Sequence, residues 1–87
     1  MDLNFVENNR ENIVELNKKV AEAISNLNID TSGPLKIAKC IRITGEINKA
    51  IKSVKTLASA IANVEPGEKA GVILSVTLQT LNSEDVK

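Results

Sequence analysis

The sequence predicts an all-α fold, with two long helices and a shorter third helix that associate as a helical bundle. Apolar residues recur at the three- and four-residue spacing of a helix face through most of the chain. Segments rich in Gly and Pro at 30–34 and 65–67 divide this pattern into three stretches. With 87 residues, the chain is expected to form one domain over 1–87, with a frayed tail at 83–87.

The first periodic stretch covers residues 2–28. Its apolar residues follow a seven-residue pattern that Asn9 interrupts once; they are Val6, Ile13, Leu16, Val20, Ala23 and Leu27. An Asn followed three residues later by Glu occurs at Asn4 and again at Asn8, and either pair could form an N-terminal capping box. The pattern predicts a helix but leaves its first residue open.

The second stretch, 34–64, has the most regular pattern. One row of seven-residue spacing consists of Ile37, Cys40, Thr44, Ile47, Ile51, Val54, Ala58 and Ile61, and a second row beside it of Ile43, Ala50, Leu57 and Val64. This face is wider than a two-stranded coiled coil needs, so the helix should contact two or more others. Thr31 or Ser32 could cap it, with Pro34 in the first turn. An unbroken helix of this length would span about 46 Å, which favours a bundle built from several copies.

The third stretch, 66–82, fits two structures. Ala70, Ile73 or Leu74, Thr77 and Leu81 form a helical face, whereas apolar residues also alternate from Val72 to Leu78 as they would in a strand. The alternative is an α+β fold with strands near 35–43 and 72–81, which would need a partner sheet because two strands alone are marginally stable. Three helices are favoured, because the 34–64 pattern stays in phase across Gly45.

The composition predicts assembly. Phe5 is the single aromatic residue, and the chain has no Trp, Tyr or His. A small chain with a thin core is usually stabilised by disulfides, metals or oligomerisation. The lone Cys40 excludes an intramolecular disulfide, and without His a zinc site is disfavoured, so no metal or cofactor is expected. The predicted assembly interface of a homo-oligomer consists of Val6, Ile13, Leu16, Val20, Leu27, Ile37, Ile47, Ile51, Val54 and Ile61.

Residue types suited to catalysis are scarce. The absence of His removes the commonest general base and any Ser–His–Asp triad, and no phosphate-binding Gly-rich motif occurs. The carboxylates of the first stretch fall at solvent-type positions, and Cys40 falls on the predicted apolar face. The sequence therefore predicts a protein that is not an enzyme and has no catalytic residues.

The charges are unevenly distributed, although 11 basic and 11 acidic residues balance overall. Residues 34–64 contain six basic residues and one acidic, whereas 1–30 contain three basic and six acidic, and 65–87 two basic and four acidic. One interpretation is that the basic helix lies beside acidic helices of its own or another chain. The other is an anion-binding site at a helix N-terminus, with Ser32, Gly33, Lys36, Lys39 and Arg42 as candidates.

These observations favour a small non-enzymatic binding or regulatory protein that acts through protein–protein interaction, as inhibitors and immunity-type proteins do. The first alternative is an oligomer that binds a small anionic ligand, such as a nucleotide, between subunits. The second is a nucleic-acid-associated protein, which zero net charge and the lack of stacking aromatics disfavour. No signal-type segment or bilayer-length apolar run is visible, so a cytoplasmic protein without a membrane partner is expected.

Overall fold

Helices make up all the regular secondary structure in the part of the chain that the computed structural model describes, residues 3–33 and 36–86. The elements, in order, are α1 (Leu3–Asn8), α2 (Arg10–Asn26), α3 (Ile37–Ser53), α4 (Lys55–Ala62), the short 3₁₀ helix η1 (Pro66–Glu68) and α5 (Lys69–Leu81). The all-α prediction is confirmed, since residues 37–43 and 72–81 of the alternative strands are helical. The predicted first-turn Pro34 lies outside the described residues.

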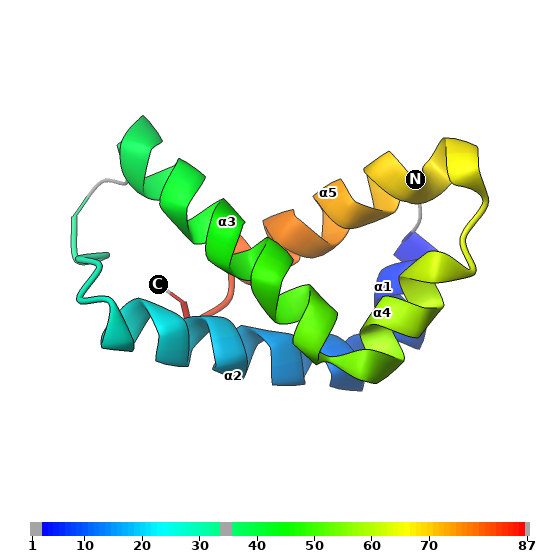
Figure 1. Cartoon of the computed structure of the whole chain (residues 1–87), viewed down its shortest axis with the longest axis horizontal. Helices are drawn as coiled ribbons and strands as arrows, with labels where there is room; N and C mark the ends of the chain where they lie inside the picture. The colour runs from blue at the N-terminus through cyan, green and yellow to red at the C-terminus, as the bar shows by residue number, and fades with distance from the viewer. Residues whose placement is uncertain (1–2, 34–35, 87) are drawn as a thin grey trace.

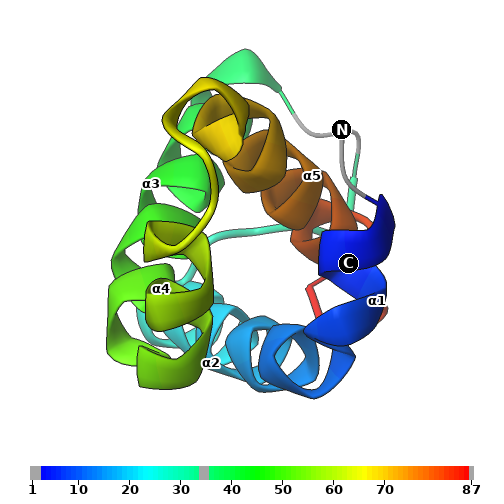
Figure 2. The ribbon, with the colours of Figure 1, turned by 90° about the vertical axis from the view of Figure 1, so that its right-hand side faces the viewer.

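Helix α5 holds the bundle together, because it contacts α1, α2, α3, α4 and η1. Helices α2 and α3 pack side by side, and Figure 1 shows α3 crossing over both α2 and α5. The end view in Figure 2 shows α3 and α4 on one side, α2 below, and α1 and α5 on the other side. The chain measures 36 × 21 × 18 Å, so its longest dimension is shorter than the about 46 Å expected for an unbroken 34–64 helix.

The first predicted helix bends at Asn9, between α1 and α2. The Asn9 backbone leaves helical geometry at φ −117° and ψ 23°. Its side-chain Nδ2 donates a 3.0 Å hydrogen bond to the Phe5 carbonyl, and its Oδ1 accepts one from Asn12. A side-chain amide that bonds to nearby backbone groups competes with the regular helix ladder, which explains the bend.

Helix α2 ends in a Schellman motif centred on Asn28, which has a positive φ of 55°. The Asn28 N–H donates to the Ser25 carbonyl, and the Ile29 N–H donates to the Ile24 carbonyl, both at 3.1 Å. Ile24 and Ile29 are both buried, so the motif turns the chain and closes this end of the core at the same time.

The second predicted helix is interrupted at Val54, between α3 and α4. Val54 has φ −95° and ψ 88°, yet its N–H still donates to the carbonyls of Ala50 and Ile51. Its side chain is buried, and its carbonyl accepts the first hydrogen bond of α4 from the Ala58 N–H. One residue therefore changes the helix direction while it remains part of the core.

The core is aliphatic. The buried apolar residues are Ile13, Leu16, Val20, Ile24, Ile29, Ile43, Ile47, Ile51, Val54, Leu57, Ile61, Val72, Val76 and Val86. The last described residues contribute to it, since Val86 is buried and residues 84–86 form a turn. The fraying predicted for 83–87 stays a prediction. Among the described helices, none has both the length and the apolar character needed to cross a bilayer.

Candidate functional site

The structure separates the ten residues predicted to form the assembly interface into three groups. Seven are buried inside a single chain, in one core cluster: Ile13, Leu16, Val20, Ile47, Ile51, Val54 and Ile61. Val6 packs partly buried against this core. Leu27 and Ile37 are the two that solvent reaches extensively. Most of the predicted apolar face is therefore occupied by the chain's own helices.

A different set of large aliphatic side chains lies on the surface. Among the described residues, the exposed ones are Val14, Leu27, Ile37, Ile41, Leu74 and Leu78. Isolated exposed aliphatic residues are ordinary, so the informative cases are those that recur along one helix face. Ile37 with Ile41, and Leu74 with Leu78, are such pairs, because residues four apart are neighbours on a helix surface.

The first pair, which we call the α3 stripe, consists of Ile37 and Ile41 in the first two turns of α3. Ile37 is 80% exposed and Ile41 is 67% exposed. Together with Cys40 and Thr44 they line a shallow apolar hollow. Helix α3 faces α2 through Glu46, Lys49, Ala50 and Ser53, and helical spacing places the stripe on the opposite flank.

The second pair, which we call the α5 stripe, consists of Leu74 and Leu78. Their exposed fractions are 58% and 49%, although Val72 and Val76 of the same helix are buried. Lys69 is the one charged residue within α5, at its first position. A helix that is apolar on its outer face as well as its inner face is typical of one that is covered on both sides. The outer side of α5 is uncovered in the single chain.

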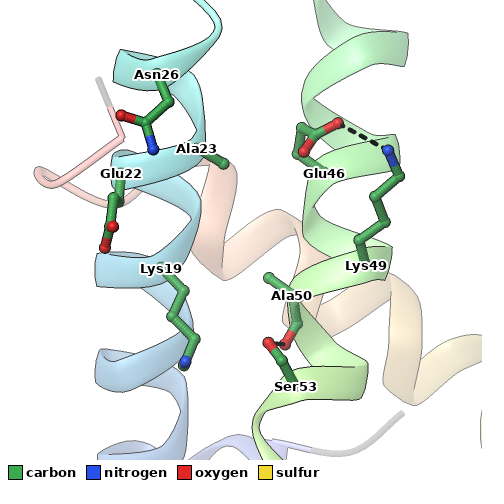
Figure 3. A pocket seen from close by; sticks show the side chains of 8 residues that line it. All are labelled: Lys19, Glu22, Ala23, Asn26, Glu46, Lys49, Ala50 and Ser53. Carbon is green, nitrogen blue, oxygen red and sulfur yellow. Dashed lines mark hydrogen bonds and ion pairs between the residues drawn. The ribbon is translucent and has the colours of Figure 1, made fainter.

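A polar groove lies between α2 and α3 (Figure 3). It is lined by Lys19, Glu22, Ala23, Asn26, Glu46, Lys49, Ala50 and Ser53. Within it, the Lys49 ammonium lies 3.4 Å from a Glu46 carboxylate oxygen, and the Ser53 hydroxyl donates to the Ala50 carbonyl. The lining charges are mixed in sign and belong to side chains that reach solvent, which is typical of a hydrated helix–helix groove.

Of the five candidate anion-binding residues, Lys36 and Lys39 lie at the N-terminus of α3, whereas Ser32 and Gly33 belong to the preceding loop. Helix α3 begins at Ile37 with Lys36 as its N-cap residue, and no side chain caps it. The Ser32 backbone N–H and hydroxyl both donate to the Asp30 carboxylate, at 2.9 and 2.6 Å. These hydrogen bonds, with a smaller contribution from the charge of Lys39, lower the pKa of Asp30. Both Ser32 donors therefore already serve an acidic side chain. Arg42 is exposed farther along α3.

The basic and acidic segments form no ion pair with each other inside the described part of the chain. Its two ion pairs are Glu7–Arg10 and Glu46–Lys49, each between residues three apart. Within residues 3–33 and 36–86, no three His, Cys, Asp or Glu side chains are grouped so as to hold a metal ion. Cys40 is half-buried and free.

Comparison of the chain with protein-family models, with curated proteins and with solved structures finds no significant match.

The sequence pattern located the core residues. It did not identify Val14, Ile41 and Leu78 as exposed, and it placed Leu74 on the same helical face as Ile73. Ile41 lies one position after Cys40, outside both seven-residue rows. Its out-of-phase position is the signal that could have identified it, because an apolar residue off the core face must contact something else or stay in water. Leu74 and Leu78 were not distinguished because apolar residues occur on both the inner and the outer face of α5.

Proposed function

We propose that this protein is a small, non-enzymatic binding or regulatory protein that acts through protein–protein contact and assembles into an oligomer. The observation that carries the proposal is the outer face of α5, where Leu74 and Leu78 are about half exposed on a helix whose inner residues Val72 and Val76 are buried. Contiguous exposed apolar residues mark surfaces that bind other macromolecules.

Further support comes from the residue types that the chain contains. The sequence has no His, and its one Cys is half-buried with no acidic or basic side chain bonded to it among the described residues. The groove between α2 and α3 contains a surface ion pair rather than a nucleophile beside a base. The anion-binding alternative has less support, because the Asp30 carboxylate already accepts hydrogen bonds from both the backbone N–H and the hydroxyl of Ser32.

Sedimentation velocity over a concentration series tests the proposal. Because the chain lacks Trp and Tyr, the boundary is followed by refractive index rather than by absorbance at 280 nm. The wild-type chain should self-associate at micromolar concentration, and replacing Leu74 and Leu78 by Ser should weaken this. The exposed Gln79 lies on the same helix, so Gln79→Ser serves as the matched control. A wild-type chain that stays monomeric throughout would contradict the proposed oligomer.

A further inference from the structure

The α3 stripe and the α5 stripe differ in the charges that surround them. Exposed Lys36 and Arg42 flank Ile37 and Ile41, and no acidic residue occurs in α3 before Glu46. The charged residues next to the α3 stripe along α3 itself are therefore basic.

Acidic residues surround the α5 stripe at both ends of the helix. Exposed Glu65 and Glu68 precede α5, and exposed Glu84 and Asp85 follow it, against Lys69 alone among the basic residues described there. The chain segments next to the two stripes thus differ in the sign of their charge.

We propose, building on the proposed function, that the partner is a second copy of this chain and that the two copies pair reciprocally. In this arrangement the α3 stripe of each copy packs on the α5 stripe of the other. A two-fold axis creates two equivalent contacts. Each contact buries the α3 stripe of one copy against the α5 stripe of the other.

Charge selects this pairing over the two simpler ones. If α3 packed on α3, the Lys36 and Arg42 side chains of the two copies would face each other. If α5 packed on α5, the acidic ends of that helix would meet acidic ends. Like charges in contact disfavour an interface, whereas opposite charges around an apolar centre favour one and fix its register.

The arrangement of the helices permits a reciprocal contact. Helices α3 and α5 contact each other, and Figure 1 shows their N-terminal ends diverging toward the top of the view. The α3 stripe lies near the N-terminal end of α3, on the flank away from α2. In the proposed pairing, each copy presents both stripes to one neighbour. The other two exposed aliphatic residues, Val14 and Leu27, are thirteen positions apart and form no stripe, and Val14 lies among Glu11, Glu15 and Lys18 of α2.

Two substitutions with opposite charge test the pairing. Ile41→Glu and Leu74→Lys are both surface changes, so circular dichroism should show the wild-type helix content for each. A reciprocal dimer contains each change twice, so either variant alone should dimerise more weakly than wild type, on the order of 100-fold. Val14→Glu is the matched control, since Val14 is also exposed and lies on α2, outside both stripes; its dimerisation should be unchanged.

Mixing the two variants gives the decisive result. In a mixed dimer, one contact pairs the introduced glutamate carboxylate with the introduced lysine ammonium, and the other contact keeps Ile41 on Leu74. Native mass spectrometry with one copy labelled with ¹⁵N should therefore show a mixed dimer that is far more abundant than either variant's own dimer. Failure of the mixed dimer to form would overturn reciprocal pairing.

The controls separate this inference from the proposed function. A wild-type chain that never associates overturns both. A wild-type dimer that tolerates Ile41→Glu and Leu74→Lys overturns the pairing alone and leaves the oligomer standing. Added salt gives an independent readout, because screening of opposite charges should weaken the reciprocal dimer, whereas a dimer with like charges in contact would become stronger.

Discussion

Ile41 and Ile43 are two residues apart on α3, yet Ile43 is fully buried in the core and Ile41 is 67% exposed. Helix geometry turns successive positions by about 100°, so a separation of two residues moves a side chain roughly half-way around the axis. The same residue type therefore has two environments in one helix: Ile43 packs in the core, and Ile41 stays in contact with water in the single chain.

This difference predicts unequal effects of the same substitution. Ile43→Ala should lower the free energy of unfolding by about 2–5 kcal/mol, because it removes buried methyl groups and leaves a cavity. Ile41→Ala should change it by less than about 0.5 kcal/mol in the monomer. Urea unfolding followed by circular dichroism, below the concentration of self-association, measures both. Equal losses from the two variants would show that the burial of Ile43 does not control stability.

Thr80 offers a stabilising substitution. Its side chain is fully buried, and its Oγ1 has no hydrogen-bond partner in the structure. Thr80→Val keeps the shape and removes the unpaired hydroxyl, so stability should rise by about 1 kcal/mol. For a domain of this size that corresponds to a melting temperature about 4–8 °C higher. Thr56→Val, at an exposed position on α4, is the control and should have little effect. A lower melting temperature for Thr80→Val would show that the hydroxyl is satisfied.

Gly45 lies inside α3, and a Cβ added there would meet no atom within 4 Å. Its φ is not positive, so an Ala can adopt its backbone conformation. Gly45→Ala should therefore stabilise the chain by about 0.5–1 kcal/mol, because it reduces the freedom of the unfolded chain and favours the helix. Thermal unfolding measures the change. Gly33→Ala, in the loop before α3, should give a smaller gain, because no helix benefits there.

The lowered pKa of Asp30 predicts that the stability of the fold depends on pH. Hydrogen bonds from Ser32, together with the charge of Lys39, lower the pKa of Asp30 below its ordinary value of 3.8. A carboxyl whose pKa is lower in the folded state contributes stability above the unfolded pKa, and this contribution is lost as the pH falls through the folded pKa. Carboxyl NMR titration should show the lowered pKa in the wild type and a return toward the ordinary value in Ser32→Ala. An unchanged pKa in that variant would contradict the assigned cause.

The fold class was readable from the sequence because helical periodicity persisted through long stretches. The apolar spacing from Ile37 to Ile61 predicted a helix, and the interruption of the pattern at Asn9 coincides with the bend between α1 and α2. For residues 72–81, the β-branched residues left a strand open as the alternative to the favoured helix. Helix prevails because α5 packs against every other helix, and tertiary contacts override weak local propensity.

Two features were hidden from the sequence. Val54 keeps the seven-residue spacing, so nothing in the pattern distinguishes it from its neighbours in the predicted helix. The helix breaks there because α3 and α4 pack around one core. The exposed stripes were concealed for a related reason. Periodicity identifies an apolar face, but it does not show whether the chain itself or a neighbour covers that face. In the structure, α4 follows the bend at Val54, and its Leu57 and Ile61 are buried in the chain's own core.

The bend at Val54 also sets where α4 and α5 are placed. If α3 and α4 continued as one straight helix over residues 37–62, it would span about 39 Å, beyond the 36 Å length of the folded chain. Leu57 and Ile61 would then leave their own core, and the last two helices could complete the same contacts only in another molecule. A straight helix at Val54 would therefore put α4 and α5 where a second chain could exchange them, as in a domain-swapped pair.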